Sequence, residues 1–152
     1  MATPSTRQQI LEALKTRLSA IDGRPPFETE IGRTIHLGEM PALGPDDPIE
    51  ACVLLPEDDV VDFQRANLLI DWPITIGAVV KADLDEPWVL VERAIADIKR
   101  AVELADRRLG IALVRDQMRR GTTRVFERPE GSTVTGAGIS YTVYYQEAWG
   151  NP

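Results

Sequence analysis

The stretch that decides the fold is ITIGAVVKADLDEPWVLVERAIADIKRAV, residues 74–102. In its first part apolar residues alternate with other residues, which predicts the end of a strand over residues 68–82. The apolar face of that strand holds Ile74, Ile76, Ala78 and Val80. The second part changes to helical spacing and predicts an amphipathic helix over about residues 86–106. The stripe of this helix comprises Trp88, Val91, Ile95, Ile98, Val102, Ala105 and Leu109.

Both predicted helices begin with a recognisable capping signal. Asp83, followed three residues later by Glu86, predicts a capping box for the helix over 86–106, and Pro87 is tolerated because it lies in the first turn. Ser5 and Gln8 have the same spacing, so a second capping box is expected near the start of the chain.

Upstream of residue 68 the chain predicts one helix and two strands. Apolar residues at helical spacing predict an amphipathic helix over about residues 5–21. Alternation over 27–37 predicts a half-buried strand, and the proline- and glycine-rich segment 38–48 is expected to be a loop. The short apolar segment 49–55 predicts a second strand, antiparallel to the first. Residues 56–67 are acidic and only weakly periodic, and no element is predicted there.

The end of the chain predicts a hairpin. Residues 110–120 fit either a continued helix or the start of a strand, and both remain open. Alternation over 122–128 and over 133–147 predicts two strands joined by a turn at 129–132. The face expected to be buried holds Ile139, Tyr141, Val143 and Tyr145. The order of elements predicts a single α+β domain, 1–152, with a mainly antiparallel sheet and two helices packed against it.

Composition excludes several classes of protein. The chain has 152 residues, of which 43% are hydrophobic and 27% charged, as in one ordinary globular domain. Its 24 acidic and 17 basic side chains give a net charge of −7, which argues against a protein that binds phosphate over its whole surface. No apolar run approaches the roughly 18 residues of a membrane span, and residues 1–10 are polar, so we expect a protein made in the cytosol with no membrane partner.

The residue types that carry catalysis stand alone here. His36 has no second histidine or cysteine near it and is expected on the polar face of a strand. Cys52 lies in an apolar strand and is expected to be a buried structural thiol. Gly136 and Gly138 precede a strand and lack the third glycine of a dinucleotide fingerprint, and no P-loop occurs. We therefore expect a protein that is not an enzyme, with no catalytic residue, no cofactor and no bound metal.

The densest acidic stretch leaves one enzyme alternative open. Its residues are Asp46, Asp47, Glu57, Asp58, Asp59 and Asp62. Paired carboxylates bind magnesium or calcium, so a small metal-dependent enzyme that uses Asp58 and Asp59 is the alternative. The spacing matches no EF-hand loop, and acidic clusters between elements are usually solvated, which favours a role without metal.

Charge is segregated along the chain. Residues 39–64 contain eight acidic residues and no Lys or Arg, whereas 107–128 contain seven arginines against Asp116 and Glu127. Patches of opposite sign suit a head-to-tail contact between copies, which closes into a ring or grows into a filament. Two alternatives are that the patches neutralise each other within one chain, or that the basic one touches nucleic acid. The charged candidates for an interface are Asp58, Asp59, Asp62, Arg115, Arg119, Arg120 and Arg124.

Two aromatic residues join these candidates. Tyr144 points away from the face that holds Tyr145, and Trp149 lies in the tail of the chain. Aromatic side chains outside a core are enriched in contacts between proteins, so both residues are candidates for contact with another chain.

Three segments together resemble a known family. They are RQQILEALKTRL (7–18), the strand and helix of residues 74–102, and ISYTVYYQEAW (139–149). Their order, the length of the chain and the Tyr-x-Val-x-Tyr pattern near its end resemble the tail terminator proteins of long-tailed bacteriophages, the minor tail protein U-like family. The resemblance spans nearly the full chain, although the loop over 38–48 has no match in it.

The resemblance implies a small α/β subunit and a structural role in the virion. Such subunits form a hexameric ring on the head-proximal end of the tail tube, end its growth and provide the surface to which the head docks. The implied partners are further copies of the chain, the major tail tube protein and head–tail connector proteins, with DNA reached only through the lumen of the ring. No catalytic residue comes with the family. A neck protein at the head–tail joint is the alternative within the virion.

Overall fold

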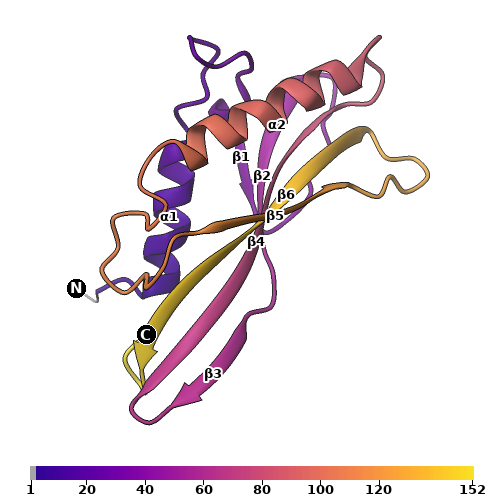
Figure 1. Cartoon of the computed structure of the whole chain (residues 1–152). Helices are drawn as coiled ribbons and strands as arrows, with labels where there is room; N and C mark the ends of the chain where they lie inside the picture. Colours follow the sequence, from indigo (N-terminus) through magenta and orange to yellow (C-terminus); the bar gives the residue numbers. More distant parts are fainter. Residues whose placement is uncertain (1–2) are drawn as a thin grey trace.

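The computed structural model describes residues 3–152 and is organised around two long antiparallel strands (Figure 1). These strands, β4 and β6, have fifteen residues each and pair along their whole length. The elements in chain order are α1 (Thr6–Leu18), the 3₁₀ turn η1 (Ile31–Arg33), β1 (Ile35–Leu37), β2 (Glu50–Pro56), β3 (Val60–Gln64), β4 (Asn67–Lys81), α2 (Pro87–Glu103), β5 (Arg119–Val125) and β6 (Val134–Ala148). The predicted strand–helix unit is thus β4 followed by α2.

Six strands form one mixed, mostly antiparallel sheet. Its strand order is β1-β2-β4-β6-β5, and β3 pairs with β4 as well. Strands β2 and β3 follow one another along the same side of β4, β3 beside residues 67–71 and β2 beside residues 74–80. The predicted α+β fold, a single domain with a mainly antiparallel sheet, is confirmed.

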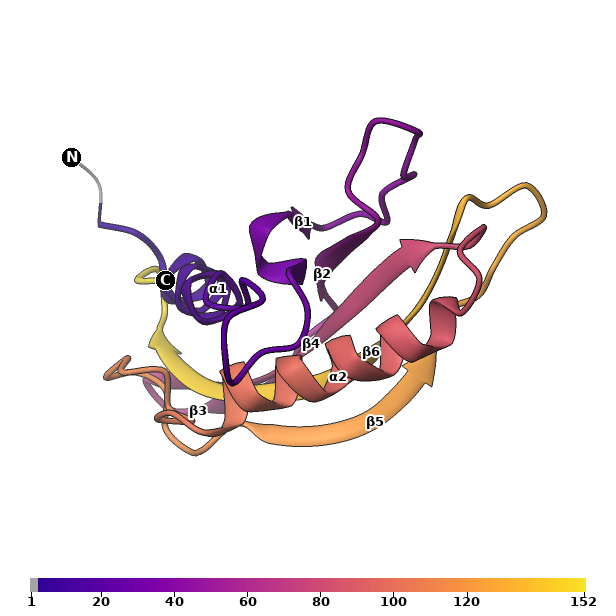
Figure 2. The same ribbon diagram turned by 90° about the horizontal axis from the view of Figure 1, so that it is seen from above.

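Both helices cover the same face of the sheet, with α1 seen nearly end-on and α2 along its length in Figure 2. The predicted apolar faces of β4 and β6 are buried beneath them. The core beneath the helices includes Ile10, Leu14, Leu18, Ile74, Ile76, Ala78, Val80, Ile139, Tyr141, Val143 and Tyr145. No helix within residues 3–152 is long and apolar enough to cross a membrane.

One of the two predicted capping boxes is present. The Ser5 hydroxyl accepts a hydrogen bond from the Gln8 backbone N–H at 3.2 Å, and the Ser5 N–H donates to Oε1 of Gln8 at 2.8 Å. The capping box predicted from Asp83 is wrong, because Glu86 is the N-cap of α2 and no side chain in the described part of the chain caps the start of this helix. Pro87 at the first helical position leaves one backbone N–H fewer to satisfy.

Helix α2 ends at Glu103, slightly earlier than predicted. The carboxylate of Asp106 accepts the backbone N–H groups of Arg108 at 3.0 Å and Gly110 at 3.2 Å, which turns the chain away from the helix. The middle of the predicted stripe, Val91, Ile95, Ile98 and Val102, is buried. Trp88 at the start of α2 is instead 42% exposed.

The strand predicted over residues 27–37 is mostly wrong. Only Ile35–Leu37 is a strand, and residues 31–33 form a 3₁₀ turn. Just before that turn, the backbone N–H groups of Glu28 and Thr29 donate to the buried carboxylate of Asp97 on α2. Because these N–H groups are already bonded to a helix, they cannot join a sheet ladder.

The pairing predicted between the first two strands is also wrong in direction. β1 runs parallel to β2, with Ile35 beside Cys52 and Leu37 beside Leu54. The segment 38–49, in which the predicted loop over 38–48 is confirmed, has the dozen or so residues that a parallel connection needs. On its other side β2 pairs antiparallel with β4, which is the partner that its sequence could not reveal.

Strand β3 was not predicted. It pairs with β4 through a two-residue connection, Arg65 and Ala66, and Arg65 has a positive φ of 25°. Two-residue hairpin turns usually contain Asn-Gly or Asp-Gly, whereas this turn is Arg65-Ala66, so the sequence gives no hairpin signal here. The predicted terminal hairpin is confirmed as β5 and β6. Of residues 110–120, left open between helix and strand, residues 119 and 120 belong to β5, and the others contain one isolated bridge, Val114 to Tyr145.

Candidate functional site

The acidic candidates gather at the β3 edge of the sheet. We call β3 together with residues 57–59 the acidic edge; it contains Glu57, Asp58, Asp59 and Asp62 and no basic residue. Asp59 pairs with Arg7 of α1 at 3.0 Å, while Asp62 is exposed and in no ion pair among residues 3–152. This edge therefore keeps a net negative charge.

The basic candidates gather on and beside β5. We call β5 together with Arg115 the basic edge. Three of its arginines pair within the chain: Arg115 with Asp71 at 2.5 Å, Arg119 with Asp116 at 3.8 Å and Arg120 with Glu103 at 3.4 Å. Exposed ion pairs of this kind contribute little to stability. Arg124 is exposed and takes part in no ion pair in the described part of the chain.

The sheet places these two edges on opposite sides. β3 pairs with β4, β4 with β6, and β6 with β5, so the two central strands separate β3 from β5. Glu57 is the exception within the acidic edge, because its carboxylate accepts the Ser140 hydroxyl of β6 at 3.5 Å and lines the same hollow as Arg124. Among residues 3–152 no ion pair joins residues 39–64 to residues 107–128. The two stretches of opposite charge thus do not neutralise each other by direct contact.

Asp62 of the acidic edge and two arginines of the basic edge lie on the same face of the sheet. Asp62 pairs with Leu69, next to the buried Ile70, and so lies on the face opposite the helices, which we call the open face. Arg119 and Arg124 pair with residues of β6 that also alternate with its buried side chains, so both lie on the open face.

Tyr144 holds two arginines of the basic edge in place. Its ring lies on the open face, with the guanidinium carbons of Arg115 and Arg119 at 5.5 and 5.6 Å from the ring centroid. A cation near an aromatic face is attracted by the ring quadrupole. The tyrosine singled out from the sequence therefore contributes to the basic edge, together with Asp71, which the sequence did not indicate.

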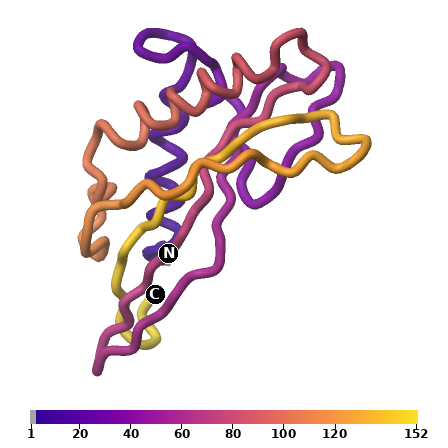
Figure 3. The backbone as a smooth tube through the Cα atoms, turned by 45° about the vertical axis from the view of Figure 1, so that its right-hand side comes forward, coloured from indigo at the N-terminus to yellow at the C-terminus, as the bar shows by residue number. Residues whose placement is uncertain are grey.

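Trp149 lies at the acidic edge instead. Its ring stacks on Phe63 of β3, with ring centroids 5.8 Å apart, and the two residues are 63% and 68% exposed. The β3–β4 hairpin that carries Phe63 projects beyond the helices, as does the end of β6 (Figure 3). Exposed aromatic pairs of this kind are typical of contacts between proteins.

The acidic edge also has a link to the core that the sequence did not reveal. The guanidinium carbon of Arg7 lies 3.8 Å from the ring centroid of buried Trp72, while Nη1 of Arg7 binds Asp59. The indole N–H of Trp72 donates to the Glu57 carbonyl at 3.0 Å. These contacts hold the backbone of residues 57–59 against α1 and β4.

The residues considered for catalysis are dispersed. Cys52 is fully buried, and burial raises the pKa of its thiol to about 12, so the thiol stays protonated at neutral pH. His36 is half-buried on β1 rather than exposed, and its Nε2 has no hydrogen-bond partner within residues 3–152. No group of three or more histidine, cysteine or acidic residues in that range is arranged to hold a metal ion.

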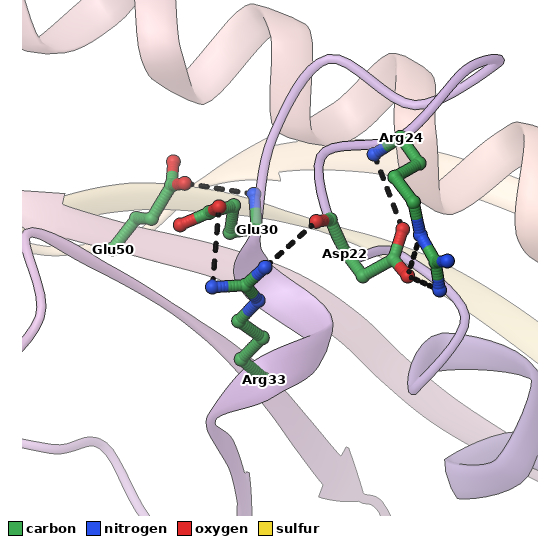
Figure 4. A network of polar contacts seen from close by, with 5 residues as sticks. All are labelled: Asp22, Arg24, Glu30, Arg33 and Glu50. Atoms are coloured by element: carbon green, nitrogen blue, oxygen red, sulfur yellow. Dashed lines mark hydrogen bonds and ion pairs between the residues drawn. The ribbon is translucent and has the colours of Figure 1, made fainter.

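The carboxylate of Glu50, at the start of β2, is half-buried, with only one of its two oxygens hydrogen-bonded in the described part of the chain. Oε1 of Glu50 accepts the backbone N–H of Glu30 at 2.9 Å (Figure 4), whereas Oε2 is buried and has no hydrogen-bond partner among residues 3–152. Burial raises the pKa of Glu50, and the negative charges of Glu30 and Asp97 raise it further. Arg33 pairs with Glu30 and not with Glu50.

Replacing Glu50 with glutamine is expected to stabilise the protein at neutral pH. A carboxyl whose pKa is raised by folding contributes most to stability below its unfolded pKa, and this contribution is lost as the pH rises through the folded value. Glutamine keeps the acceptor for Glu30 and carries no charge. Chemical unfolding of both proteins should show a gain at pH 7 that disappears below pH about 4. A gain in the free energy of unfolding that is equal at pH 7 and below pH about 4 would contradict this explanation. So would the same pH-dependent gain in the control Glu39→Gln, because Glu39 is exposed.

Comparison with protein-family models and with curated proteins finds no match to this chain.

Proposed function

We propose that this protein is a structural protein of a bacteriophage virion, a tail terminator whose copies form a ring on the head-proximal end of the tail tube. The ring ends tube growth and provides the surface to which the head docks. The observation that carries the proposal is the opposite charge of the two sheet edges, which gives each copy two different, complementary surfaces.

Complementary surfaces on opposite sides favour a closed ring. A contact between unlike patches is heterologous, so each copy can bind a neighbour on either side, and the series closes when the rotation between copies allows it. The resemblance of the sequence to tail terminators in element order and chain length is the second support for the proposal. We expect the protein to be located in the virion, as a ring of six copies.

The other implied partners have a surface available as well. The β3–β4 hairpin, which projects beyond the helices in Figure 3, carries the exposed Phe63, whose ring stacks on exposed Trp149 at the end of β6. We assign this hairpin to contact with the tail tube protein or with a head–tail connector protein, since aromatic side chains commonly anchor such contacts.

The proposal is tested on the tube itself. Major tail tube protein from the same genome is polymerised, the purified protein is added, and the tubes are examined by electron microscopy before and after more tube protein is supplied. We expect additional density at one end of each tube and no growth from that end. Tubes that elongate equally at both ends would contradict the proposal, and binding to purified head connectors but not to tubes would instead favour a neck protein.

A further inference from the structure

We propose that neighbouring copies join edge to edge, with β5 of one copy pairing with β3 of the next so that one sheet continues through the contact. This inference rests on the proposed function and specifies the contact between copies of the ring. It follows from three properties of the two strands: their unpaired backbones, their charge and their direction.

Both strands have a free side within the chain. Among residues 3–152, β3 pairs only with β4 and β5 only with β6, so each presents backbone N–H and C=O groups on its outer side that no strand of this range pairs with. All seven residues of β5 are exposed, as are four of the five in β3. An exposed edge strand is a template for pairing with another chain unless something prevents it.

Charge selects which edges can meet. Two acidic edges repel each other, as do two basic edges, whereas an acidic edge attracts a basic one. On the open face this brings Asp62 of one copy beside Arg124 of the next, and neither has an ion-pair partner in its own chain among residues 3–152. On the opposite face exposed Val125 provides apolar area for the same contact. Opposite charges directly across a strand pair are stabilising.

The strand directions are also compatible. Across β3, β4, β6 and β5 every neighbouring pair is antiparallel. β3 therefore runs opposite to β5, and placing the β3 of a second copy beside β5 in the same orientation continues the antiparallel series. The directions of β3 and β5 within each copy therefore already fit an antiparallel contact between copies.

A charge exchange tests the edge contact. Asp62→Arg and Arg124→Asp should each reduce the association constant of the copies at least tenfold, because each brings like charges together. The double variant restores an opposite pair and should recover most of the association. Glu12→Arg and Lys15→Asp on exposed positions of α1 are the matched controls and should leave association unchanged. Single variants that associate normally, or a double variant that is no better than the single ones, would overturn the inference.

Cross-linking distinguishes this contact from other arrangements. Gln64→Cys on β3 and Thr122→Cys on β5 are prepared separately, with tags of different size, and Cys52 is fully buried and does not compete. On oxidation of the mixture we expect disulfides between the two variants and none within either one. Disulfides within one variant, or rings that form without any cross-link, would overturn the edge contact and leave the ring itself standing. Chains that neither associate nor cross-link would contradict both.

Discussion

Replacing Asp97 with alanine is expected to lower the free energy of unfolding by about 3–5 kcal/mol. Asp97 is fully buried in α2. Its carboxylate accepts the backbone N–H groups of Glu28 and Thr29 at 3.0 and 2.8 Å, the Thr29 hydroxyl at 2.8 Å and Nη1 of Arg100 at 2.8 Å. Alanine would leave these donors without their acceptor. Two of them are the backbone N–H groups of Glu28 and Thr29, which lie outside the sheet of the described residues and have no strand there to pair with.

The effect is measured by urea unfolding at pH 7, with Arg100→Ala as the comparison. Arg100 is partly exposed, so its loss should cost about 1 kcal/mol or less. Asp97→Ala should also loosen residues 28–30, which hydrogen exchange of their backbone amides would detect. A loss of stability below about 1 kcal/mol for Asp97→Ala would show that this carboxylate does not anchor the segment.

Replacing Gly136 with alanine should be about as harmful, with an expected cost of about 3 kcal/mol or more. Gly136 lies in β6 opposite Val79, in the middle of the sheet. A Cβ atom there would lie 2.1 Å from the carbonyl oxygen of Ala78 and 3.1 Å from its carbonyl carbon. Both are backbone atoms of β4, so relief of the clash requires the two central strands to move apart.

Gly44→Ala is the matched control for Gly136→Ala. Gly44 lies in the loop before β2, and the nearest atom to an added Cβ is Oδ2 of Asp47 at 3.4 Å, an ordinary contact. Loss of glycine there should change stability by less than about 1 kcal/mol, since alanine also reduces the freedom of the unfolded chain. Equal thermal unfolding midpoints for the two variants would contradict the account of close packing between β4 and β6.

The parts of the fold that the sequence predicted are those with a long, regular apolar pattern. The strand over 68–82, the helix over 86–106 and the second strand of the terminal hairpin each bury a continuous face, so alternation or helical spacing alone reveals them. The capping box of Ser5 and Gln8 is local as well, because both partners lie within one turn.

The errors arose where a distant residue decides the local structure. Residues 27–30 look like a strand, but Asp97, far along the chain, takes up their backbone N–H groups. The direction of β1 depends on the path of the loop over 38–48, and β3 is held by its long partner β4 rather than by its own composition. Such contacts leave no periodic trace in the sequence.

The two charged edges could be predicted only in part, because they too depend on which distant segments the fold brings together. The sequence shows that acidic and basic residues are segregated, but only the strand order shows that β3, with Asp62, and β5, with Arg119 and Arg124, lie at different edges of the sheet. The loop with Asp46 and Asp47 lies elsewhere, beside residues 126–133. Arg120 was selected with the basic residues, yet it faces the helices and binds Glu103, which also accepts the Tyr141 hydroxyl. The clusters of Arg115, Asp71 and Tyr144 at one edge, and of Phe63 with Trp149 at the other, exist only in three dimensions.

The central claim is that copies of this chain assemble head to tail into a ring, and its most direct test is the mass of the protein in solution. Light scattering behind size exclusion would be recorded at several protein and salt concentrations, with the same fractions imaged by electron microscopy. We predict an oligomer that grows with protein concentration, closes into rings and weakens as salt screens the charged edges. A monomer at every protein and salt concentration, with the tail tube protein present or absent, would contradict the account.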